Sequence, residues 1–188
     1  MTGRLRIHVS AAFRAGLLLL ALGPASPSAR PDEAEDAIKA VAVLNFIRYS
    51  TWTPPIVDPL VVGVNGRPGF LDTLRATLQS RPINGHTVRV VEVRNVAEAQ
   101  SCQLLYLATS RVAQIQPFLS SPVLTHTLTI GESDRFLDLG GAVNFYLADG
   151  HIAFEASLDA LDKAGILVSS NLLRLGQVRA RGRTRGQP

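Results

Sequence analysis

Apolar and polar positions between residues 34 and 130 follow helical and strand periods in turn. A mostly apolar stretch with helical spacing at 34–50 follows Asp32 and Glu33, which suit a helix N-terminus, and ends before Thr53-Pro54-Pro55. Beyond it, strand patterns alternate with helical ones. The strand patterns lie at 60–64, 87–93, 102–107 and 123–130, and the helical patterns at 70–79, 96–100 and 111–119. This alternation favours a mostly parallel sheet with right-handed crossovers.

The pattern after residue 140 predicts a β-hairpin. Apolar runs at 142–147 and 151–157 flank Ala148-Asp149-Gly150, a tight-turn signal in which Gly150 can take a positive φ. The apolar residues from Leu158 to Val178 recur nearer to helical than to strand spacing, so we expect a docked C-terminal helix. The expected fold is a single α/β domain of three layers, with a mostly parallel sheet that ends in a C-terminal antiparallel hairpin and is flanked by helices.

Residues 1–29 have the pattern of an export signal. Basic residues precede a short apolar run at 15–22, and small side chains follow it. The run is too short for a membrane anchor, which takes about 20 apolar residues. We therefore expect cleavage near Ala25 to Ala29 and a periplasmic location, with an uncleaved membrane tether as the alternative. Residues 30–178 then form one domain.

The formal net charge of +4 hides an uneven distribution. Between Pro31 and Leu173 there are ten Lys and Arg against fifteen Asp and Glu, which gives a net charge of −5. The excess positive charge lies in the leader and after residue 173. Residues 179–188, rich in Arg and Gly, are expected to form a disordered basic tail that is solvated or contacts a membrane or a partner. Nucleic acid is not an expected partner of an exported protein.

The residues that carry chemistry do not assemble into a catalytic motif. Gly63, Gly66 and Gly69 have the spacing G-x-x-G-x-x-G at a strand-to-helix junction, but Pro68 removes an N–H that a phosphate loop needs. A structural turn is favoured, with ligand binding as the alternative. In that alternative, Gly66, Gly69 and Arg111 are the candidate ligand-loop residues, at the carboxyl ends of parallel strands.

The positions of the other reactive residues in the sequence indicate structural roles. The histidines after the leader stand alone, without metal-ligand spacing, and Glu132, Asp134 and Asp138 are expected to solvate a loop and cap a short helix. Cys102, the one cysteine, begins an apolar run and is expected to be a buried free thiol. We predict no enzyme, no catalytic residue, no metal and no cofactor.

Two blocks of residues resemble the YfiR family of small exported bacterial proteins. One block is Gly140-Gly141, Phe154-Glu155 and Ser169-Ser170-Asn171-Leu172-Leu173, and the other runs from Ala37 to Thr51-Trp52-Thr53-Pro54. The resemblance covers roughly residues 35–178. The family commonly has a cysteine near Gly63, bridged to one at the position of Cys102, so the resemblance implies that this chain has lost the bridge.

The resemblance also implies a function. The family's namesake represses an inner-membrane diguanylate cyclase by binding its periplasmic region, and an outer-membrane lipoprotein relieves that repression. We therefore expect a non-enzymatic periplasmic regulator that lowers cyclic di-GMP, with a homodimer as a further association. Trp52, Tyr146, Phe154 and Glu155 are the candidate contact residues, and core packing is the alternative role of the aromatic ones. A periplasmic small-ligand-binding sensor domain is the alternative function.

Overall fold

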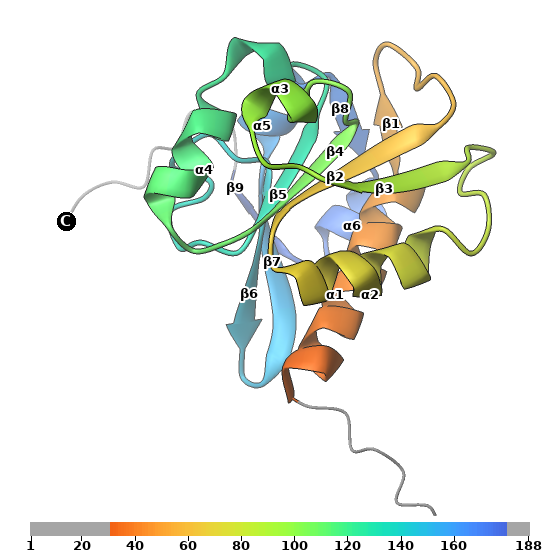
Figure 1. Cartoon of the computed structure of the whole chain (residues 1–188). Helices are drawn as coiled ribbons and strands as arrows, with labels where there is room; N and C mark the ends of the chain where they lie inside the picture. Colours follow the sequence, from red (N-terminus) through yellow and green to blue (C-terminus); the bar gives the residue numbers. More distant parts are fainter. Residues whose placement is uncertain (1–30, 180–188) are drawn as a thin grey trace, which may run out of the picture.

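A seven-stranded sheet forms the centre of the computed structural model, which describes residues 31–179 (Figure 1). Its strand order is β3-β2-β4-β5-β6-β7-β9. Strands β3 to β6 pair in parallel, β7 pairs antiparallel with β6, and β9 pairs in parallel with β7. The bounds are β2 (Leu60–Gly66), β3 (Val88–Glu92), β4 (Leu104–Ala108), β5 (Leu128–Gly131), β6 (Val143–Ala148), β7 (His151–Ser157) and β9 (Gln177–Arg179). The mostly parallel sheet with a C-terminal antiparallel hairpin is confirmed.

Helices cover both faces of this sheet, as the three-layer expectation requires (Figure 1). Along β4, Leu104 and Tyr106 pack into the core under the helices α1 and α2, whereas Leu105 and Leu107 pack into the core under α3 and α4. The helices are α1 (Pro31–Arg48), α2 (Pro68–Leu78), α3 (Val96–Ala99), α4 (Val112–Leu119), α5 (Leu158–Lys163) and α6 (Ser170–Leu173). A small second sheet pairs β1 (Ser50–Trp52) with β8 (Ile166–Val168).

An aromatic cluster joins α1 to the sheet. Phe46 of α1 meets Phe154 of β7 edge-on, with ring centroids 5.1 Å apart, and Phe145 of β6 at 6.0 Å. Tyr106 lies 6.0 Å from Phe145 and 4.4 Å from Phe70 of α2. Such rings bury large apolar areas, so the cluster fixes α1 and α2 over the middle of the sheet.

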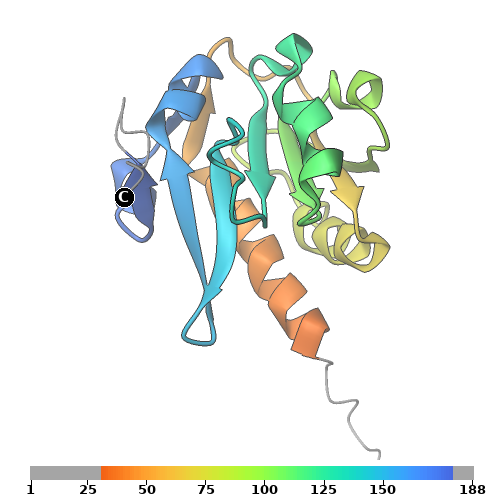
Figure 2. The same cartoon turned by 90° about the vertical axis from the view of Figure 1, so that its left-hand side faces the viewer.

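The hairpin of β6 and β7 closes with the turn that the sequence predicts. Asp149 and Gly150 have φ values of 49° and 76°, the left-handed pair that suits the twist of a two-residue hairpin. Figure 2 shows this turn projecting beyond the ends of the neighbouring strands.

The expected docked C-terminal helix is wrong. The segment after β7 divides into α5, β8, the four-residue α6 and the edge strand β9. Gly165 ends α5 with a φ of +67°, and a Cβ there would lie 2.5 Å from the Thr53 carbonyl oxygen. The apolar spacing therefore reflects short elements that dock one after another into the same core.

The expected strand at 123–130 is also wrong in its first half. Ser121 caps a short 3-10 helix, η1 (Pro122–Leu124), and β5 begins only at Leu128. His126 between them has a φ of 68°, which interrupts an extended backbone.

The predicted tail begins too early, because Arg179 belongs to β9. Its guanidinium pairs with Asp138 at 2.5 Å and with Glu155 at 3.1 Å, and its side chain is 21% exposed. Its neighbours 180–188, and the predicted leader at 1–29, lie outside the described residues.

We expect Arg179→Ala to lower the free energy of unfolding by about 1 kcal/mol, because two carboxylates lose a half-buried partner. Urea denaturation measures the change. Arg81→Ala, at an exposed arginine in the loop after α2, is the control and should stay within about 0.5 kcal/mol of the wild type. Equal effects of the two variants would contradict the docking of Arg179.

Gly63 and Cys102 are neighbours in the core, as the resemblance implies. A Cβ on Gly63 would lie 2.7 Å from the Cys102 sulfur and 2.7 Å from a methyl group of Val93. Cys102 is a buried free thiol, as expected, and burial raises its pKa to about 11. The thiol is therefore protonated and poorly nucleophilic at neutral pH.

Gly63→Cys should form a disulfide with Cys102 in a glutathione redox buffer. The closed loop of about 40 residues is expected to add roughly 2–4 kcal/mol of stability, less the cost of displacing Val93. Mass spectrometry and melting with and without reductant measure the bond and its effect. Two free thiols after oxidation would show that the sites do not meet as described.

Candidate functional site

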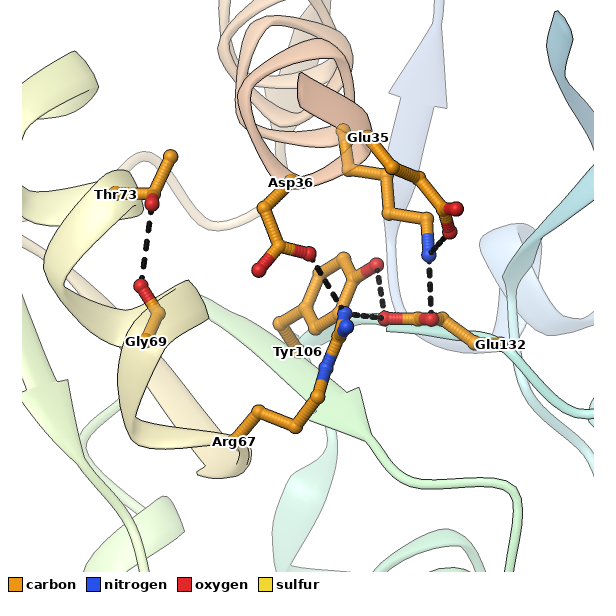
Figure 3. A network of polar contacts seen from close by, with 8 residues as sticks. Glu35, Asp36, Arg67, Gly69, Thr73, Tyr106 and Glu132 are labelled. Atoms are coloured by element: carbon orange, nitrogen blue, oxygen red, sulfur yellow. Dashed lines mark hydrogen bonds and ion pairs between the residues drawn. The ribbon is translucent and has the colours of Figure 1, made fainter. Parts of the chain in front are cut away.

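A network of charged and polar side chains lies at the carboxyl end of the parallel strands, under α1 (Figure 3). Its centre is Glu132, directly after β5. One carboxylate oxygen accepts a hydrogen bond from Lys39 Nζ at 2.6 Å, and the other accepts from the Tyr106 hydroxyl at 2.8 Å and from Arg67 Nη2 at 3.1 Å. Glu132 thus joins α1, the end of β2 and the middle of β4.

The first turns of α1 supply the other members. Lys39 also pairs with Glu35 at 2.5 Å, one helical turn earlier, and Asp36 pairs with Arg67 Nη2 at 2.9 Å. The Lys39 side chain is 5% exposed. The helix spacing places Glu35, Asp36 and Lys39 toward the sheet, so the polar network continues the apolar contact made by Phe46.

Burial and the neighbouring charges set the protonation of this network. Burial raises the pKa of Tyr106 well above its usual value, and Glu132 raises it further, so the phenol remains a hydrogen-bond donor. Burial also raises the pKa of Asp36, while Arg67 and Lys39 act in the opposite direction. The pKa of Arg67 is raised because Glu132 and Asp36 outweigh the effect of its burial. The guanidinium is therefore held charged between two carboxylates.

A cavity opens beside the network at the carboxyl ends of β2 and β4. It has a volume of about 380 Å³ and is lined by Arg67, Ala108, Thr109, Ser110, Arg111, Gln114 and Glu132. A second cavity of about 430 Å³ shares Gln114 and includes Asn65, Gly66 and Asn95. The two hollows lie along one edge of the sheet, where α/β proteins commonly bind small molecules.

The structure brings two of the three ligand-loop candidates to this edge. Arg111 lines the first cavity and Gly66 the second, whereas Gly69 lies in the first turn of α2. A Cβ on Gly69 would meet no atom within 4 Å, and its carbonyl oxygen accepts a hydrogen bond from Thr73 (Figure 3). The Gly-rich segment thus opens a helix that starts with Pro68.

The four contact candidates have different surroundings. Trp52 is buried, with its indole N–H donating to the Gln103 carbonyl oxygen, and Phe154 is buried against Phe46. Glu155 is mostly buried and engaged with Arg179. Tyr146, near the hairpin turn, is half-buried, and it is the one aromatic candidate of the three that is not buried.

The expectation that Glu132 solvates a loop is wrong, and the network around it was missed. Asp138 of the same segment pairs with Arg179 instead of capping a helix. Two features of the sequence indicated a polar network: Lys39 within a mostly apolar helical stretch, and Tyr106 within an apolar strand pattern. Neither feature identifies Glu132 as the partner, because Glu132 is 93 residues from Lys39 in the sequence.

The sequence model of the YfiR/HmsC-like family matches residues 36–177, which is more than half of the chain. The chain belongs to this family. The YfiR/HmsC-like family consists of periplasmic proteins that are regulatory and not catalytic. No curated protein matches the sequence.

Two kinds of feature are absent from the part of the chain that the structure describes. Within residues 31–179, no helix is long and apolar enough to cross a membrane. The same residues contain no group of three His, Cys, Asp or Glu side chains placed to hold a metal ion.

Lys39→Met should lower the free energy of unfolding by about 3 kcal/mol, because it leaves the Glu132 and Glu35 carboxylates without a buried cation. Methionine retains most of the side-chain length, so the loss reports charge more than volume. Chemical denaturation measures it, with Lys163→Met at an exposed site as the matched control. A loss below about 0.5 kcal/mol for Lys39→Met would mean that the network does not hold α1.

Proposed function

We propose that this protein binds the periplasmic region of an inner-membrane diguanylate cyclase and lowers its cyclic di-GMP output. The observation that carries the proposal is the YfiR/HmsC-like family match over residues 36–177. In the same proposal, the chain reaches the periplasm through its leader, which is cleaved near Ala25 to Ala29, and an outer-membrane lipoprotein relieves the repression. A homodimer is a further proposed association.

The hairpin turn is the part of the surface that best suits this contact. Leu147, at the end of β6, is 62% exposed and stands beside the half-buried Tyr146. Ile38 and Val41 of α1 are 55% and 50% exposed. The hairpin turn and the first turns of α1 project from the same end of the molecule (Figures 1 and 2). Apolar and aromatic side chains on rigid elements make strong interface anchors.

The burial of the other candidates narrows this contact surface. Trp52 and Phe154 are packed in the core, so replacing either by alanine would cost about 3–5 kcal/mol of stability and would not isolate binding. Glu155 holds Arg179 and is likewise part of the fold. The proposed contact therefore rests on Tyr146 and its neighbour Leu147.

Deleting the gene should raise cellular cyclic di-GMP and increase adhesion, and the wild-type gene should restore both. Leu147→Asp should fail to restore them while its melting temperature stays within a degree or two of the wild type, because it places a charge in the contact without touching the core. The Tyr146→Ala gene should also restore low cyclic di-GMP less completely than the wild-type gene does. Quantification of cyclic di-GMP by mass spectrometry measures the outcome.

Leu167→Asp is the matched control, since Leu167 of β8 is 66% exposed and lies away from the hairpin turn (Figure 1). It should repress as the wild type does. If the deletion leaves cyclic di-GMP unchanged in a strain that expresses the protein, cyclase repression is wrong. If both leucine variants repress fully, the hairpin turn is not the contact.

Sensing of a small ligand in the periplasm is a second candidate function, and the two cavities at the carboxyl edge of the sheet favour it. It is compatible with repression, because a ligand in the cavities and a partner at the hairpin turn can act on the same fold.

A further inference from the structure

The first cavity lies where the sheet changes its direction of winding. From β2 the chain passes through α2 to β3 on one side, and from β4 it passes through α4 to β5 on the other. Helices α2 and α4 pack on opposite faces, since their buried residues belong to the two separate cores. The loops after β2 and β4 therefore diverge and leave a crevice between them, which is where open α/β sheets bind ligands. The cavity of about 380 Å³ occupies this crevice.

The wall contributed by β4 and α4 is rich in unused donors. Arg111 precedes α4 and is exposed, and within residues 31–179 it has no acidic partner. Helix α4 begins without a side-chain cap, and the Arg111 carbonyl oxygen accepts from the N–H groups of Gln114 and Ile115. The Thr109 hydroxyl donates to Gln114 Oε1 at 2.8 Å, which leaves the amide nitrogen of Gln114 available.

The opposite wall holds a guanidinium in a fixed position. Both ion pairs of Arg67 use Nη2, at 2.9 Å to Asp36 and 3.1 Å to Glu132, so Nε and Nη1 remain available. The guanidinium also lies over the Phe70 ring, 5.7 Å from its centroid. Among residues 31–179, Glu132 is the only acid that lines the cavity, and its oxygens already accept from Lys39, Tyr106 and Arg67. The crevice therefore offers donors and almost no free acceptor.

The buried network explains how Arg67 is held in place. A contribution to stability does not by itself explain why a polar network is present at this position. Apolar side chains of similar volume are often at least as stabilising as a buried ion pair. A network that fixes one guanidinium at the wall of a cavity has the form of a supporting shell, which holds a binding group in its productive geometry.

We infer that this crevice binds a small ligand through an oxyanion group, a carboxylate or a phosphate, held between Arg111 and Arg67 at the start of α4. Arg111 supplies the uncompensated charge, Arg67 a single N–H donor beside its two ion pairs, and Ser110 and Gln114 further hydrogen bonds. The inference goes beyond repression of a cyclase, and binding to the purified protein tests it without a cyclase.

Isothermal titration calorimetry with sodium phosphate and with sodium succinate, in a low-salt chloride buffer, separates the two oxyanions. The wild type should bind at least one of them at low-millimolar concentration or tighter, and the better probe identifies the class. Arg111→Gln should weaken that binding by about tenfold or more, since a hydrogen bond to a charged group contributes roughly 1.5–3 kcal/mol. Amide NMR shifts on titration should concentrate at residues 108–114.

Arg89→Gln is the matched control. It removes the same charge from an exposed site on β3 that does not line the cavity, and it should bind as the wild type does. The inference is overturned if neither probe binds the wild type at about 10 mM. It is equally overturned if the two variants lose affinity by the same factor, which would indicate diffuse attraction to positive charge, or if the shifted amides lie elsewhere.

Discussion

The interaction on which this structure depends most is the one between Glu132 and its three donors. Lys39, Arg67 and Tyr106 come from a helix, a loop and a central strand, and one carboxylate holds all of them at the carboxyl edge of the sheet. Lys39 and Tyr106 are buried and Arg67 is partly exposed, so the buried part of the network is strong only while it is complete. The orientation of α1 and the wall of the neighbouring cavity follow from the same set of contacts.

Around this network, the fold follows from covering a parallel sheet on both faces. Every residue of β4 is buried, and alternate side chains enter the two separate cores. The hairpin then changes the pairing to antiparallel and carries the sheet beyond its helical cover. The cavities and the projecting hairpin turn thus both lie at the carboxyl end of the parallel strands, and the proposed ligand and the proposed partner use different residues there.

Local patterns predicted the elements because each pattern reports a local cause. The β-branched run of β2, the turn at Asp149-Gly150 and the acidic start of α1 all appear where expected. The prediction of a C-terminal helix was wrong because apolar residues of α5, β8 and α6 enter one core from separate short elements. Their spacing in the sequence is close to the helical period. The assignment of Arg179 to the tail was wrong because the residues around it in the sequence are also rich in Arg and Gly. Its position depends instead on an ion pair with Asp138, 41 residues away.

The candidate site was harder to predict because its members are distant in the sequence. Gly66 and Arg111 could be placed at the cavities, since the carboxyl ends of parallel strands share one edge. Glu132 could not be connected to Lys39, because only the docking of α1 across the sheet brings the two together. For the contact candidates, sequence identified aromatic residues but not their exposure, and the structure buries Trp52 and Phe154.

The most direct measurement of the central role of Glu132 is a double-mutant cycle of Lys39→Met and Glu132→Gln, with the free energy of unfolding determined for all four proteins. The network predicts a coupling energy of about 2 kcal/mol or more, because the second substitution removes a group that the first has already left unpaired. Single effects that add to within about 0.5 kcal/mol would contradict the account. The two residues would then act independently, and the position of α1 would depend on apolar packing alone.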